Sequence, residues 1–124
     1  MSATKLVSIV PLLLLAAVIS SAAVPRPLDP LVVAPHIYQL EFQNEQVRVL
    51  RQTIRSGETQ SVHAHPDRVM VYLQTCGWLE DDGEGGQRMQ QFKFGEAVWA
   101  PAETHGGYTA NVEQDCIILE IELL

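Results

Sequence analysis

From residue 37 onward the sequence consists of short runs in which apolar and β-branched residues alternate with polar ones, each closed by turn residues. Runs of this kind predict β-strands, and no stretch of useful length has the period of an amphipathic helix. Many short strands at regular spacing favour one antiparallel β-barrel or sandwich. The predicted strands are Ile37–Phe42, Gln46–Ile54, Ser61–His65, Val69–Thr75, Gly77–Glu80, Gln87–Phe94, Ala97–Ala100, Gly107–Thr109 and Asp115–Glu122.

Two of these predictions carry further detail. The acidic and glycine-rich segment Asp81–Gly86, DDGEGG, predicts a hairpin turn, because its glycines tolerate positive φ. In the last run, DCIILEIELL, a row of Ile and Leu alternates with a row that contains Glu120 and Glu122. We expect the apolar row to face the interior and the two glutamates to face water.

The first 23 residues have a different composition. Lys5 precedes an apolar run from Leu6 to Ile19, and the small residues Ser20–Ala23 follow. This order is typical of a secretory signal peptide cut after Ala23. The sequence therefore predicts a secreted or periplasmic protein with no stable membrane insertion after cleavage. The alternative is an uncleaved N-terminal membrane anchor.

Residues 24–36 contain four prolines and predict an extended, irregular arm, either poorly ordered or draped over the domain. The remaining residues, 37–124, fit one β domain. Without residues 1–23 the chain carries seven basic and 15 acidic side chains. Nothing basic clusters, so nucleic acid is excluded as an expected partner.

Two cysteines, Cys76 and Cys116, lie in predicted strands far apart in the sequence. An oxidising compartment would permit a disulfide between them. Buried free thiols fit the same pattern, and the sequence leaves both alternatives open.

The histidines are the main candidates for chemistry. His63 and His65 are two residues apart, and alternate residues of a strand share a face. Both imidazoles are then able to reach one metal ion. His105 follows in a later segment, GEAVWAPAETHGGYTAN, and supplies a third ligand from another strand.

The spacing of these residues resembles the two motifs of the cupin superfamily. In the first motif Gly57 precedes His63 and His65, and Gly77 follows; in the second, Gly95 and Pro101 precede His105 and Asn111. The resemblance implies a small single-domain cupin whose fold is an antiparallel jelly-roll barrel. It departs from the family at three points: Met70 stands where the metal-binding Glu is expected, Glu103 stands at a glycine position, and His105 comes one residue early.

The resemblance also implies a site. Its metal ligands are His63, His65 and His105, and the ion is a divalent transition metal: Fe, Mn, Zn, Ni or Cu. Tyr72 and Glu103 are candidate catalytic residues that handle a proton. If Met70 points inward, strand alternation turns Tyr72 and Gln74 inward as well. The candidate pocket-lining residues are Gln60, Met70, Gln74 and Trp99.

The expected function follows from this site. The resemblance implies an exported cupin that binds or acts on a small organic molecule, with dioxygenase, isomerase or lyase chemistry among the family's activities. Whether the chain is an enzyme stays open. The alternative is a non-catalytic, metal-free binding or structural module, favoured by Met70 in place of the carboxylate. The outward apolar row of Val69, Val71 and Leu73 needs a cover, which is either the other sheet or a second subunit, so a homodimer is one of two expected arrangements.

Overall fold

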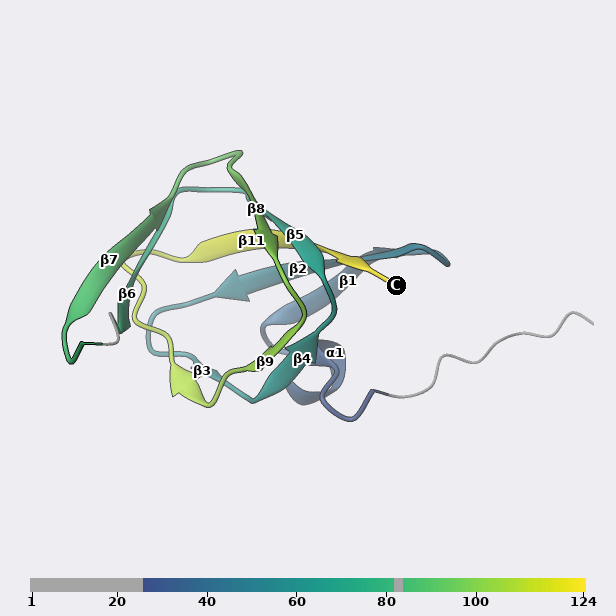
Figure 1. The fold of residues 1–124 in the computed structure, drawn as a ribbon, viewed down its shortest axis with the longest axis horizontal. Coiled ribbons are helices and arrows are strands. Elements are labelled where there is room, and N and C mark those ends of the chain that lie inside the picture. Colours follow the sequence, from purple (N-terminus) through teal and green to yellow (C-terminus); the bar gives the residue numbers. More distant parts are fainter. Residues whose placement is uncertain (1–25, 82–83) are drawn as a thin grey trace, which may run out of the picture.

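A five-stranded antiparallel sheet forms one wall of the protein, with strand order β1-β2-β11-β5-β8 (Figure 1). The computed structural model describes residues 26–81 and 84–124. Strand β11 is central in this sheet, with β2 on one side and β5 on the other. The five strands are β1 (Tyr38–Gln43), β2 (Val47–Ile54), β5 (Arg68–Tyr72), β8 (Ala97–Ala100) and β11 (Cys116–Leu123).

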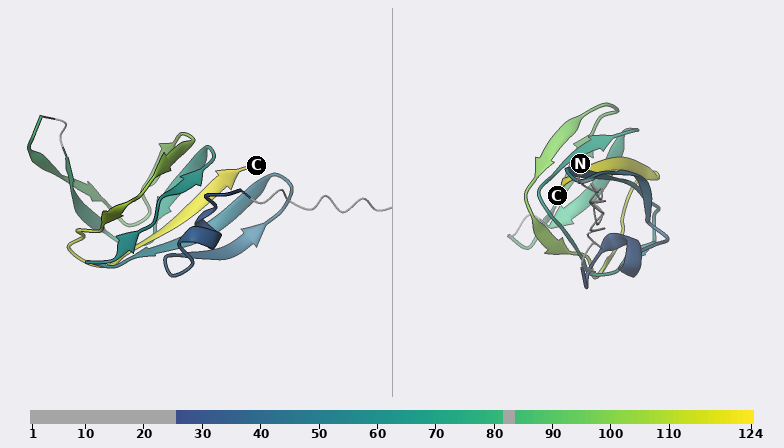
Figure 2. Two further views of the ribbon diagram at one scale, coloured as in Figure 1. Left: turned by 90° about the horizontal axis from the view of Figure 1, so that it is seen from below. Right: turned by 90° about the vertical axis from the view of Figure 1, so that its right-hand side faces the viewer.

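Three two-stranded sheets form the rest of the barrel. Figure 2 shows the strands arranged in a ring when the molecule is seen end-on, and the β6–β7 hairpin projecting from one end of the molecule. This architecture confirms the prediction of an all-β antiparallel barrel. The three pairs are β3 (Thr59–Gln60) with β10 (Tyr108–Thr109), β4 (His63–His65) with β9 (Glu103–His105), and β6 (Cys76–Asp81) with β7 (Gln87–Phe92).

Each predicted strand overlaps an observed one, and the differences lie in short elements. Strand β9 falls between two of the predicted strands, in a segment for which no strand was predicted, since Glu-Thr-His has no hydrophobic alternation. Its strand geometry comes from pairing with β4, a tertiary contact that local sequence does not encode. The hairpin predicted at Asp81–Gly86 joins β6 and β7 as expected, and its residues 82 and 83 lie outside the described residues.

The proline-rich arm is draped over the barrel, but it is not wholly extended. Residues Pro30–Val33 form a short helix, α1, because the Asp29 side chain accepts a hydrogen bond from the Leu31 N–H (2.9 Å) and Pro30 suits the first turn. The Ala64 N–H donates to the Leu28 carbonyl (2.8 Å), which ties the arm to β4. The predicted signal peptide, residues 1–23, lies outside the described residues.

Among the described residues no helix has the length and apolar character needed to cross a bilayer.

The inward face of β11 corrects the prediction for the closing strand. Glu120 and Glu122 are 1% and 0% exposed, so they point into the barrel and not into water. The neighbouring strands explain this: Arg48 of β2 and Arg68 of β5 both stand opposite Glu122 in register, and both arginines are buried. Buried glutamates are tolerated because these guanidinium groups compensate their charge.

The apolar core lies at the other end of the same inward faces. Cys76 and Cys116 are buried there as free thiols, and their side chains interact with each other. Ile54, Tyr72 and Ile118 pack around them. A second, smaller cluster holds Ala34, Ile37, Tyr38 and Leu50, and so joins the arm to β1 and β2.

We predict that the buried Glu122 carboxylate is essential for stability. Replacing it in Glu122→Ala leaves the buried Arg48 with Asp29 as its remaining partner and His65 without its acceptor, which should lower the free energy of unfolding by about 3–5 kcal/mol in urea denaturation. The matched control is Glu41→Ala, which removes an ion pair to Arg51 whose two side chains are each 35% exposed. Its expected cost is about 0–1 kcal/mol. Equal losses in the two variants would contradict the buried network.

Candidate metal centre and adjoining cavity

Three histidines from two paired strands form a cluster. In the β4–β9 register His63 lies opposite His105, and His65 lies two residues further along β4. His63 and His65 are buried, and His105 is half-buried. One ring nitrogen from each histidine lies within 4.8 Å of the others. The cluster is therefore close enough for one ion to be held after small rotations of the imidazoles.

Hydrogen bonds fix the orientation of two rings. His63 Nδ1 lies 2.6 Å from the Ser61 carbonyl oxygen, and His65 Nδ1 lies 2.7 Å from Glu122 Oε1. Both acceptors lie within hydrogen-bond distance of Nδ1, so each ring turns its Nε2 atom toward the cluster. The third ring, His105, has a buried Nε2 without a hydrogen-bond partner. Oriented imidazoles with available Nε2 atoms are the arrangement that metal-binding histidines usually show.

The protonation state of the rings suits a metal. Burial lowers the pKa of the His63 imidazole. Burial, with His63 close by, lowers the pKa of His105 to about 4. Only a neutral imidazole has a lone pair to donate, so two of the three ligands are in their binding form at neutral pH. On donor type, orientation and charge, the cluster fits a divalent transition metal.

A series of buried charged side chains fixes the position of the His65 ring. Glu122 accepts from His65 through one oxygen and from Arg48 Nε through the other (2.6 Å). Arg48 also pairs with Asp29, the residue that caps helix α1 (2.5 Å). Burial would raise the pKa of Glu122, but the hydrogen bonds from His65 and Arg48 outweigh it and lower the pKa. The carboxylate thus stays ionised and keeps the His65 ring in place.

Gly106 sets the distance between the two strands. A Cβ atom at this position would lie 2.3 Å from the Ser61 carbonyl oxygen, and the residue has a φ of 107°. Both features require glycine. Because Ser61 orients His63 and Gly106 follows His105, this close approach brings the two histidines together.

Tyr38 is a site residue that the sequence patterns did not reveal. It begins β1, and its hydroxyl lies 2.9 Å from His63 Nε2 and 3.4 Å from His65 Nε2. Gln52 donates to the same oxygen (2.7 Å). The signal is weak in the sequence, since one tyrosine at the start of a strand rich in polar residues looks like ordinary packing.

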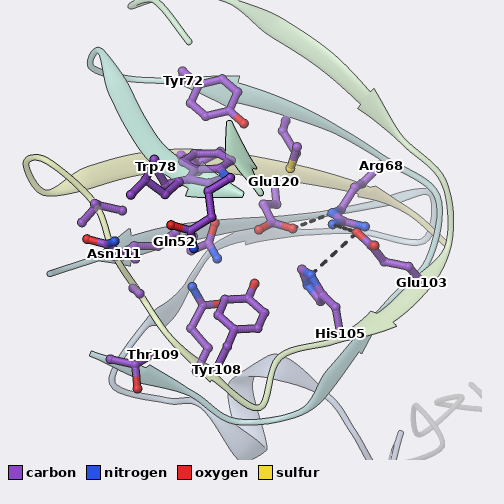
Figure 3. Close-up of a pocket in the computed structure, with 18 residues that line it drawn as sticks. Gln52, Arg68, Tyr72, Trp78, Glu103, His105, Tyr108, Thr109, Asn111 and Glu120 are labelled. Carbon is purple, nitrogen blue, oxygen red and sulfur yellow. Dashed lines mark hydrogen bonds and ion pairs between the residues drawn. The ribbon is translucent and has the colours of Figure 1, made fainter. Parts of the chain in front are cut away.

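A cavity of about 670 Å³ adjoins the cluster and includes His105 in its wall (Figure 3). Arg68 also lines it, and its guanidinium contacts two carboxylates: Glu103 at 2.6 Å and Glu120 at 2.8 Å. Among the described residues, Arg68 is the one arginine that lines the cavity, and its charge is compensated by these carboxylates. Burial raises the pKa of Glu120, an effect that the charges of His65 and Arg68 reduce.

An aromatic group forms another part of the wall. Tyr72 and Trp78 line the cavity, and Phe92 stacks on Tyr72 with ring centroids 4.3 Å apart and an interplanar angle of 1°. The Tyr72 hydroxyl is buried and has no hydrogen-bond partner, and burial raises its pKa. It stays neutral and is available to bond a ligand.

The pocket residues predicted from sequence divide into two groups. Gln60 and Met70 line the cavity, and the Gln60 Oε1 atom is buried without a partner instead of bonding an imidazole. Gln74 is half-buried and is not among the lining side chains, because β5 ends at Tyr72 and alternation does not continue beyond it. Trp99 is 55% exposed and outside the cavity, so its placement in the pocket was wrong.

The register explains the position of Trp99. It stands opposite Val69 on the outward face of the sheet, whereas its neighbour Val98 stands opposite Met70 on the inward face. Glu103, the other tentative catalytic residue, lines the cavity from β9. Partial burial would raise its pKa, but the bond from Arg68 and the nearby His105 lower it, so the carboxylate is a weak base.

We predict that His105 of the metal-free protein stays neutral down to about pH 4, because its pKa is lowered by burial and by His63. An unfolded histidine binds a proton near pH 6.5, whereas His105 in the folded protein binds one only near pH 4. Protonation between these two pH values therefore favours the unfolded state. The stability that is present above pH 6.5 is lost as the pH falls toward 4. NMR titration of the ring protons measures this, with His105→Gln to assign the signal. A midpoint near 6.5 would contradict the buried cluster.

No protein-family model and no curated protein matches this chain. Similar folds occur among solved structures. A protein from Bacillus halodurans is 14% identical, with a TM-score of 0.50 over 70% of this chain and 69% of its own. A cupin domain from Bordetella pertussis is 24% identical, with a TM-score of 0.49 over 71% of this chain and 92% of its own.

KdgF from Halomonas sp. is 22% identical, with a TM-score of 0.49 over 73% of this chain and 81% of its own. These likenesses concern the fold alone. The described residues form a small antiparallel β-barrel.

Proposed function

We propose that this protein binds one divalent transition-metal ion through the Nε2 atoms of His63, His65 and His105, and that it takes a small organic molecule into the adjoining cavity. The observation that carries the proposal is the buried, unpartnered Nε2 of His105 beside two imidazoles whose Nδ1 atoms are already bonded. A buried acceptor without a partner is costly, and a metal ion would satisfy it.

The roles of the protein groups follow from their contacts. A bound divalent ion supplies Lewis-acid chemistry or a site for a chelating substrate. Ser61 and Glu122 hold the ligand rings, while Arg68 keeps Glu103 ionised at the cavity wall. The neutral Tyr72 hydroxyl hydrogen-bonds a molecule in the cavity, and the aromatic wall excludes water from one side of it.

The charged side chains that line the cavity indicate which class of ligand it binds. Arg68 alone would favour an anion, but Glu103 and Glu120 neutralise it. The aromatic wall of Tyr72 and Trp78 supplies an apolar contact surface. A neutral molecule, or one that binds chiefly by chelating the metal, fits this site better than a free anion. Dioxygenase, isomerase and lyase reactions all remain within the proposal.

Two further parts of the proposal rest on sequence and surface. The composition of residues 1–23 supports export by a signal peptide. The outward face of the five-stranded sheet supports a homodimer, since it carries exposed Trp99 beside the half-buried Val69 and Val71 of the adjacent strand.

A metal-free binding module is the second candidate. Met70 lines the cavity and offers only a soft thioether in place of a carboxylate. In that case the cavity alone would bind the ligand, and the histidines would stabilise the barrel through their hydrogen bonds. The presence or absence of metal separates the two candidates.

We predict that the chain, purified without a histidine tag, binds one equivalent of Co(II) or Zn(II), because one ring nitrogen from each of three imidazoles lies within 4.8 Å of the others. His105→Ala should lose most of this uptake in calorimetric titration and elemental analysis, with the fold retained. His36→Ala is the matched control: His36 is exposed and outside the cluster, and it should bind as the unaltered chain does. Equal uptake by the two variants, or none by the unaltered chain, would rule out this site.

A second prediction concerns the cavity. The two tryptophans differ in position, since Trp78 lines the cavity and Trp99 is exposed on the outer face. In Trp99→Phe the remaining fluorescence comes from Trp78, and a molecule that enters the cavity should quench or shift it. In Trp78→Phe the same molecule should leave the Trp99 emission unchanged. A response confined to Trp99 would show that ligands bind elsewhere.

A further inference from the structure

We propose that the Tyr38 hydroxyl oxygen is a fourth protein ligand of the metal, supplied by β1 in place of the carboxylate that the site lacks. The inference rests on the proposed function, since it requires that an ion binds at the histidine cluster. Its evidence is the position of the Tyr38 oxygen relative to the ligand nitrogens.

The distances between donor atoms match a shared coordination sphere. With metal–donor bonds of about 2.1 Å, neighbouring donors lie roughly 3.0 Å apart in an octahedron and roughly 3.4 Å apart in a tetrahedron. The Tyr38 oxygen lies 2.9 Å from His63 Nε2 and 3.4 Å from His65 Nε2. Both Nε2 atoms face this region, because each ring has its Nδ1 bonded elsewhere.

A single hydroxyl proton satisfies only one of these nitrogens. Tyr38 donates it to His63, the nearer ring, and the contact to His65 is longer. In the metal-free protein the Tyr38 hydroxyl thus has one proton for two nearby Nε2 atoms, and His105 Nε2 is buried without a hydrogen-bond partner. A cation placed among them satisfies all of these lone pairs at once.

The surroundings of the oxygen suit an anionic ligand. Gln52 stands opposite Tyr38 in the β1–β2 register, and its side-chain N–H donates to the oxygen at 2.7 Å. Tyr38 is 2% exposed, and the Ala34 carbonyl accepts from its backbone N–H (3.1 Å) at the end of α1. The arm and β2 therefore hold the oxygen in place before any metal binds.

Coordination forms a metal–oxygen bond and releases the phenolic proton to water. A divalent cation is the largest local charge once it binds, and it favours the phenolate over the phenol. Binding should then release a proton that Tyr38→Phe does not release.

The test uses Cu(II) as the probe, because a phenolate bound to Cu(II) gives a visible charge-transfer band that imidazole ligands lack. The full chain with one equivalent of Cu(II) should show this band, and Tyr38→Phe should lose it and bind Cu(II) about 10 to 100 times more weakly. Tyr108→Phe and Tyr72→Phe are matched controls from the cavity wall and should keep the band. Thermal melting checks that each variant is folded.

A third variant tests the ligand role apart from stability. The hydrogen bond from Gln52 stabilises the electrons of the phenolate oxygen. Gln52→Leu removes this bond and so lowers the energy of the charge transfer. The band should therefore persist and move to longer wavelength. Bound Cu(II) without a band, or a band that survives in Tyr38→Phe, would overturn the role of Tyr38 and leave the three-histidine site intact. Failure of the unaltered chain to bind Cu(II) would overturn both.

Discussion

The arrangement depends on one buried carboxylate. Glu122 of the central strand accepts from His65 and from Arg48, and Arg48 in turn pairs with the cap of helix α1. Through these contacts a single side chain joins the sheet, the N-terminal arm and the histidine cluster. Burying it is favourable only because both partners are present, since an unpaired buried charge costs several kcal/mol. The orientation of His65 and the position of the arm thus have the same physical cause.

The geometry of the histidine site depends on strand pairing as well as on these contacts. Strand pairing places His63 opposite His105, and the tight approach of Gly106 to Ser61 keeps the two strands close. The Nδ1 atoms of the three rings face away from the cluster, and each lies near a hydrogen-bond acceptor or a carboxylate. The Nε2 atoms face inward, and that of His105 has no hydrogen-bond partner. Tyr38 shares this inward region. The cavity beside it has an aromatic wall and an arginine that is paired with a carboxylate. A ligand thus contacts the cavity wall, while the metal binds at the histidines.

Sequence patterns predicted the strands and the histidine group because both depend on short-range order. Alternation of apolar residues predicts strands, and the spacing of His63 and His65 places two imidazoles on one face. The orientation of β11 was not predictable in this way, since both of its faces carry apolar residues. The decisive information was the pair of arginines on the flanking strands, which requires knowing that β2 and β5 are its neighbours.

Residues whose role depends on long-range contacts were missed or misplaced for the same reason. Tyr38 reaches the histidines from a strand 25 residues earlier in the chain, and no motif marks it. Trp99 looked like a pocket residue by its position near Pro101, but its register opposite Val69 turns it outward. Gln74 lies past the end of β5, where strand alternation no longer applies.

The central claim is that three histidines hold one metal ion, and X-ray absorption spectroscopy of the Co(II)- or Zn(II)-loaded protein tests it most directly. The account predicts one ion per chain with three imidazole nitrogens at about 2.0–2.1 Å in the first shell. A bound ion surrounded only by water and carboxylate oxygens would contradict it, as would a protein that retains no metal after reconstitution.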